Sequence, residues 1–149
     1  MKRFVFVCVV FCLFSAVSCR SHKQDVKVSV SPEFSAEEVW ELTSVRGRAV
    51  TYAEGQKHAT LCVNPEAGTV SGHNGCNSFF GNFENLGNGK MKLTQIMSTK
   101  MACPEPFHKL ESQYMQTLSH CDGYDINAYS LNLMQGEKIV LSFDKQQSR

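Results

Sequence analysis

Two short runs decide the fold: Gly72-His73-Asn74-Gly75-Cys76-Asn77 and, further along the chain, Ser98-Thr99-Lys100-Met101-Ala102-Cys103. The first run holds too much glycine and asparagine for a plain strand, because these residues favour turns and bends. The second run ends in a cysteine that Pro104 follows directly. We therefore predict that a small β-fold turns sharply at these two runs and is covalently joined there.

Alternating apolar and polar residues surround the two runs, which is the pattern of half-buried strands. Glycines 72, 75 and 81 fit a bulge or a sharp bend where side chains would clash, with Phe79, Phe80 and Phe83 packed against it. Gly87-Asn88-Gly89 is a hairpin turn signal. The segments expected as strands are 40–42, 48–52, 58–63, 69–71, 90–93, 124–126, 129–133 and 139–143, and residues 94–101 fit either a strand or an extended loop.

One helix is expected between Pro104 and Asp122-Gly123. A first helical turn accepts proline without losing a hydrogen bond. An apolar stripe follows at steps of three and four residues, formed by Phe107, Leu110, Tyr114 and Leu118. Many short strands with regular turns and a single helix predict a mainly β (α+β) fold, a small antiparallel β-barrel-like domain with one amphipathic helix.

The first residues have the form of an export signal. Lys2 and Arg3 precede an apolar run, Phe4 to Ala16, that is shorter than the ~20 residues needed to span a bilayer. A basic start and a short apolar run are typical of a secretory signal peptide. The run ends Ala16-Val17-Ser18-Cys19, which resembles a bacterial lipobox, although leucine is usual where Ala16 stands.

We therefore predict a signal peptide over residues 1–18, lipidation of Cys19 and a polar lipidated tether over residues 19–32, with ordinary cleavage as the alternative. Acyl chains on Cys19 would make the membrane a partner of the protein. No acidic run of the kind that resembles a surface-export signal follows this cysteine, which favours the outer membrane with the domain facing the periplasm.

Length and charge limit the remaining possibilities. The 149 residues suffice for one domain, expected over residues 33–145, with a polar tail at 146–149. Loss of Lys2 and Arg3 with the leader takes the formal net charge from +1 to −1. Such a chain has no electrostatic footprint for nucleic acid and no basic stripe for a membrane-surface helix. We expect a monomer.

The cysteines suggest disulfide bonds. Of the seven cysteines, Cys8 and Cys12 leave with the leader and Cys19 takes lipid. Four remain, an even number in an exported chain, and they allow three pairings among which the spacing does not choose. Buried reduced thiols are the alternative. The four are Cys62, Cys76, Cys103 and Cys121.

The two runs also resemble the META domain family, which contains HslJ-like heat-shock lipoproteins. The resemblance covers about residues 33–145 and implies a compact, mostly antiparallel β-domain with one helix in bacterial envelope proteins, without catalytic residues. It favours a disulfide between Cys76 and Cys103, which leaves Cys62 to pair with Cys121. The matching positions are Trp40, Gly72, Gly75, Cys76, Asn77, Gly81, Thr99, Met101 and Cys103.

Other chemistry has weaker support. Cys76 beside His73 could form an activated thiol, but no third residue orients the pair. A metal site would need His73, His108, His120 and a thiolate, and no known ligand spacing is present. Trp40 could be a ligand platform, although a core anchor is the better interpretation. We predict no catalytic residue, no cofactor and no metal site.

The expected function is a non-enzymatic bacterial envelope lipoprotein, a binding or structural module linked to envelope stress, whose expected partner is an envelope protein. The alternative is a carrier of a small apolar ligand inside the barrel. Ten phenylalanines and six methionines favour a filled interior over a cavity.

Overall fold

The computed structural model describes residues 34–35, 38–105 and 107–146. The predicted signal peptide, the lipidation site at Cys19, the tether and residues 147–149 of the tail lie outside the described residues. Among the helices of the described part, none is long and apolar enough to cross a bilayer.

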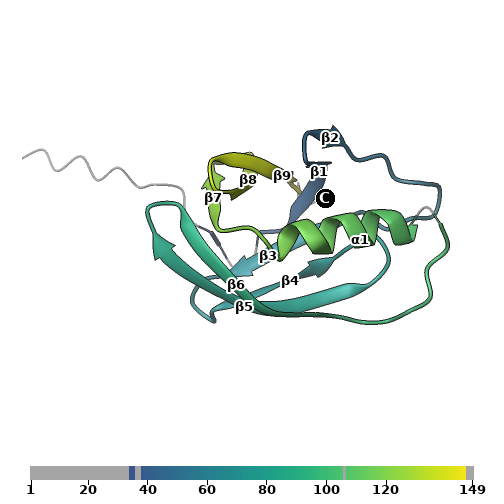
Figure 1. The fold of residues 1–149 in the computed structure, drawn as a ribbon, viewed down its shortest axis with the longest axis horizontal. Coiled ribbons are helices and arrows are strands. Elements are labelled where there is room, and N and C mark those ends of the chain that lie inside the picture. The colour runs from purple at the N-terminus through teal and green to yellow at the C-terminus, as the bar shows by residue number, and fades with distance from the viewer. Residues whose placement is uncertain (1–33, 36–37, 106, 147–149) are drawn as a thin grey trace, which may run out of the picture.

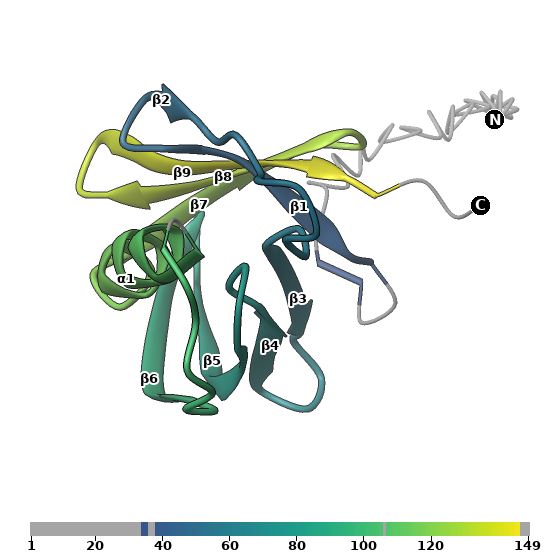
Figure 2. The same cartoon turned by 90° about the vertical axis from the view of Figure 1, so that its right-hand side faces the viewer.

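The described residues form one antiparallel sheet of nine strands that curls until its two ends meet (Figure 1, Figure 2). The spatial order is β2-β1-β3-β4-β5-β6-β7-β8-β9, and pairing of β1 with β9 almost closes a barrel. This confirms the predicted fold class. The strands are β1 (Trp40–Val45), β2 (Arg48–Ala49), β3 (Thr60–Asn64), β4 (Thr69–His73), β5 (Ser78–Gly87), β6 (Lys90–Ser98), β7 (Gly123–Ile126), β8 (Ser130–Gln135) and β9 (Lys138–Lys145).

The ring of strands has two thin joints, which are places where neighbouring strands share only one or two residue pairs. β6 and β7 share one residue pair, Lys90 with Gly123. β3 and β1 share two pairs, of Leu61 with Trp40 and of Thr60 with Glu41. The helix α1 (Phe107–Leu118) follows β6 and lies in Figure 2 between β6 and the strands β8 and β9. It therefore covers the side where β6 and β7 diverge.

Tyr114 ties the helix to both sides of the sheet. Its ring meets Phe79 of β5 edge-on at 5.7 Å and Phe143 of β9 at 6.0 Å between centroids. Its hydroxyl donates a hydrogen bond to the carbonyl oxygen of Thr60 in β3, at 3.2 Å. Burial raises the pKa of this phenol well above its usual range. The predicted apolar stripe thus faces the core, where Tyr114 and Leu118 are fully buried.

Two strands differ from the sequence prediction. β5 is a ten-residue strand where we expected apolar bulk against a bulge or bend, and the β5–β6 register does shift between Phe80 and Asn82, as a bulge at Gly81 requires. Its buried face reads Phe79, Gly81, Phe83, and the glycine breaks the apolar alternation because Ile96 already fills the space of a side chain there. The strand expected at 48–52 ends at Ala49. Val50 N–H still donates to the Thr43 carbonyl at 2.9 Å, and further on the Tyr52 hydroxyl donates to the Leu42 carbonyl at 2.8 Å in place of a backbone group.

Candidate functional site

The two motif runs meet beside the start of β5. The first run forms the end of β4 and the loop into β5, and the second follows the end of β6. Thr99 N–H donates to the carbonyl of Ser78 at 2.9 Å, which continues the β5–β6 ladder into the second run. A disulfide joins Cys76 to Cys103, with 6.1 Å between their Cα atoms, a separation that such a bond accommodates. This is the pairing that the family resemblance implied.

Asn77 connects three segments through one buried amide. Its side chain is 2% exposed. The oxygen Oδ1 accepts hydrogen bonds from Met101 N–H at 2.8 Å and from the Thr99 hydroxyl at 2.9 Å. The nitrogen Nδ2 donates to Oε1 of Glu111 on the helix at 2.9 Å. One side chain thus holds the first run, the second run and α1 together.

Asn74 completes this arrangement. Its Oδ1 accepts from the backbone N–H groups of Cys76 and Asn77, at 3.2 and 2.7 Å, which fixes the loop between them. Its Nδ2 donates to the same Glu111 oxygen at 3.1 Å. We call Asn74, Asn77, Glu111 and the Cys76–Cys103 disulfide the polar junction. Its geometry is that of a joint between segments, in which each buried amide has partners.

Two glycines of the first run are required by the local backbone, Gly72 for the close approach of β3 and Gly75 for a positive φ angle. A Cβ on Gly72 would lie 2.1 Å from the carbonyl oxygen of Thr60 and 2.8 Å from the Phe79 ring. Gly75 has a φ of +95°, a conformation that other residues rarely adopt. The predicted bend is therefore found at Gly75, whereas Gly72 lies in the regular ladder of β4 and is needed there for the close approach of β3.

The pairing of Cys62 with Cys121 is not formed, because Cys62 on β3 points away from the core, whereas Cys121, between α1 and β7, lies inside it. Cys62 stands between the buried residues Leu61 and Val63 on β3 and so points away from the core. Cys121 belongs to the core and is a free thiol whose sulfur donates to the Thr117 carbonyl at 3.4 Å. Burial raises the pKa of Cys121 to about 12, so this thiol stays protonated.

The other candidate residues are also placed. His73 does not face a thiol, since Cys76 is in the disulfide and Nδ1 of His73 accepts from Gly75 N–H at 3.1 Å. Among the described residues, the cysteines and Glu111 of the polar junction form a group of metal-ligand type, within 4.8 Å of one another, and its two sulfurs are bonded together. Trp40 is 1% exposed and is a core residue.

The lowered pKa of His73 makes the free energy of unfolding depend on pH. Burial is the main cause that lowers the pKa of His73 below 6.5, and the charge of Lys57 adds to it. As the pH falls below about 6.5, the unfolded chain takes up this proton before the folded one does, so the free energy of unfolding should fall until the folded pKa is passed. Urea unfolding of His73→Gln across this range should show a flatter profile than the wild type; an unchanged profile would contradict the assignment.

Loss of the disulfide should be costly. The bond closes a loop of 27 residues, and the loop-entropy argument assigns it about 3.5 kcal/mol. We expect the double variant Cys76→Ala with Cys103→Ala to unfold at correspondingly lower urea concentration. Reduction of the wild type should reproduce the effect, and reduction of the variant should change nothing. Equal stability of wild type and variant without reductant would mean that the bond does not form.

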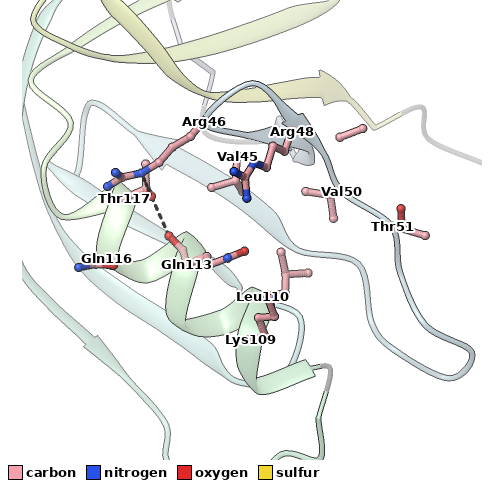
Figure 3. A pocket seen from close by; sticks show the side chains of 11 residues that line it. Val45, Arg46, Arg48, Val50, Thr51, Lys109, Leu110, Gln113, Gln116 and Thr117 are labelled. Atoms are coloured by element: carbon pink, nitrogen blue, oxygen red, sulfur yellow. Dashed lines mark hydrogen bonds between the residues drawn. The ribbon is translucent and has the colours of Figure 1, made fainter.

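A groove on another part of the surface is the candidate binding site (Figure 3). It has a volume of about 590 Å³ and lies between the β1–β2 hairpin and α1. Figure 3 shows Arg46 and Arg48 reaching from the hairpin toward the helix, which presents Leu110 and Gln113. The lining residues are Val45, Arg46, Arg48, Ala49, Val50, Thr51, Lys109, Leu110, Gln113, Gln116 and Thr117.

The groove was missed in the sequence because its walls are about sixty residues apart in the chain. One signal was present. In Val45-Arg46-Gly47-Arg48 two arginines flank the glycine of a two-residue hairpin turn. Such turns favour asparagine and glycine, so an arginine in the turn itself is unexpected.

A curled antiparallel sheet with one helix at its open side and a disulfide between two loops defines a class of small α+β domain. Residues 33–148 match the META domain, and the chain belongs to this family. It is also similar to two solved structures. The first is the NMR structure of a protein from Burkholderia xenovorans, with 26% identity and a TM-score of 0.58 over 85% of this chain and 99% of that one.

The second is another NMR structure, with 25% identity and a TM-score of 0.56 over 73% of this chain and 89% of that one. No curated protein matches the chain. The comparisons therefore agree with the observed fold.

Proposed function

We propose that this chain is a lipid-anchored protein of the bacterial envelope whose META domain binds a partner protein and carries out no bond chemistry. The observation that carries the proposal is the cationic groove on a domain whose interior is filled. Arg46, Arg48 and Lys109 line the groove. The expected location is the outer membrane with the domain in the periplasm, and the expected role is linked to envelope stress.

The placement of the groove along β1 supports a tethered binding module. Trp40, at the start of β1, pairs with Lys145 near the end of the described chain. Arg46 follows the other end of the strand, which is six residues long. At about 3.3 Å per residue, roughly 17 Å separate the two ends. The predicted tether ends at residue 32, and Phe34 packs against Phe83 of β5 and Tyr124 of β7, neither of which lines the groove. A tether that enters beside Phe34 would thus leave the groove uncovered.

The filled interior argues against the alternative, a carrier of an apolar ligand. Large side chains at the inward positions are almost fully buried, among them Trp40, Tyr114 and Phe143. In a small barrel such side chains leave no room for a ligand. Native mass spectrometry of the purified protein tests this, because a co-purified lipid would favour the carrier.

Metabolic labelling tests the anchor. Bacteria that express the chain should incorporate labelled palmitate into it, and the label should be lost in Cys19→Ala but kept in the control Cys62→Ala. Membrane fractionation should place the labelled protein with the outer membrane. Recovery of the protein from the cytosol with its leader attached would overturn the proposal.

A further inference from the structure

We propose that the groove between β2 and α1 binds an extended acidic segment of a partner protein, which adds as a strand to the open edge of β2. This deepens the proposed function, since it names the chemistry of the partner for a domain taken to be a binding module. The argument rests on the edge of β2, on the charges of the groove and on the conformation of Arg46.

The edge of β2 is free to pair. Within the described residues β2 pairs only with β1, beside the half of β1 that β3 leaves uncovered. Val50 N–H donates to the Thr43 carbonyl at 2.9 Å. Because successive residues of an antiparallel strand direct their backbone groups to opposite sides, those of Ala49, which stands between Arg48 and Val50, point away from β1. Ala49 lines the groove, so an added strand would find a backbone partner there.

The charges of the groove select an acidic occupant. Arg46 and Arg48 lie on one wall and Lys109 on the other, and none of the described residues that line the groove carries a carboxylate. Apolar contacts are available at Val45, Val50 and Leu110. An extended peptide presents its side chains to two sides in alternation, so acidic residues can face the cations while small apolar residues face the apolar positions. A small anion would use the cations but neither the edge nor the apolar positions.

Arg46 is held in place for this task. Its φ is +49° and that of Gly47 is +74°, which is the left-handed conformation of the two turn residues. Arginine in this conformation is strained, and such strain concentrates at functional positions. Nε of Arg46 donates to the Thr117 hydroxyl at 3.2 Å, a bond that does not involve the two Nη groups. The Thr117 hydroxyl in turn donates to the Gln113 carbonyl at 2.7 Å.

The experiment uses the full chain as the cell produces it, purified in a neutral detergent. The probe is a fluorescein-labelled, amidated peptide of eight residues in which glutamate alternates with valine and threonine, and binding is followed by anisotropy. Arg46→Asn should weaken binding at least tenfold while the fold stays intact, because asparagine suits this turn position. Arg48→Glu should have a similar effect. The control is Lys92→Asn, which removes one positive charge at an exposed position of β6. This variant should bind the peptide as tightly as the wild type does.

Three further probes identify the occupant. A peptide with glutamine in place of glutamate, and a glutamate peptide with N-methylated backbone, should both bind at least tenfold more weakly. Glutarate, a small dicarboxylate, should compete only at much higher concentration. Binding that is equal for wild type and Arg46→Asn, or absent, would overturn the proposal. Competition by glutarate at the concentration of the peptide, or binding that N-methylation leaves unchanged, would show a small-anion site and overturn it equally.

These measurements are independent of the anchor. If palmitate labelling fails and the peptide still binds at Arg46, the envelope assignment is lost and the groove assignment stands. If labelling succeeds and the peptide does not bind, the lipoprotein assignment stands and this groove is not its acidic-peptide site.

Discussion

Asn77→Ala is expected to lower the free energy of unfolding by about 3 kcal/mol, since it removes a buried amide that bonds to three partners. The Thr99 hydroxyl and the Met101 N–H lose their acceptor at 2.9 and 2.8 Å, and the Glu111 carboxylate loses one of its two amide donors. Each lost bond costs about 1 kcal/mol, because Met101 is exposed and Glu111 keeps the hydrogen bond from Asn74. Urea denaturation followed by circular dichroism measures the change.

Asn132→Ala is the matched control. This asparagine is half-buried on β8 and is not part of the polar junction. The change should stay within about 0.5 kcal/mol, as for surface positions in general. If Asn77→Ala were as mild as the control, the polar junction would not hold the two runs to the helix.

Gly72→Ala is expected to be still more damaging, with a loss of more than about 4 kcal/mol or failure to fold. The added Cβ would lie 2.1 Å from the Thr60 carbonyl oxygen, which belongs to the backbone of β3. Relief requires β3 and β4 to separate, so overpacking and lost ladder hydrogen bonds add together. The measurement is the midpoint of thermal or urea unfolding.

The neighbouring exposed residue offers the control for this change. Ser71→Ala adds no atom to the β3–β4 contact and should leave the unfolding midpoint almost unchanged. A well-folded Gly72→Ala protein of near wild-type stability would contradict the close approach of β3 to β4 at this position.

The features that could be predicted are those that local chemistry determines. Gly87-Asn88-Gly89 turns β5 into β6 as expected, because the turn needs the positive φ angles that these residues accept. The helix was predictable from its apolar stripe, in which Tyr114 and Leu118 are buried. Each of these two signals is carried by residues that lie close together in the chain.

The features that were missed depend on contacts between distant segments. The strand β5 was not predicted because a glycine, Gly81, interrupts its apolar alternation. The space of a side chain at Gly81 is filled by Ile96, fifteen residues later in the chain. The Cys62–Cys121 pairing was expected only because these two cysteines remained after Cys76 was paired with Cys103. Alternation along β3 shows that Cys62 and Leu61 point to different faces of the strand, but it does not show where Cys121 lies. The groove joins Arg46 and Lys109, which nothing in the linear chain brings together.

The two thin joints of the ring have a mechanical consequence. Between them the sheet divides into two curved shells, one of β3 to β6 and the other of β7 to β9 with β1 and β2. Tyr114 touches both shells, through Phe79 on one and Phe143 on the other. The helix therefore braces the two shells against each other, and this brace also sets the distance between β2 and α1 across the groove.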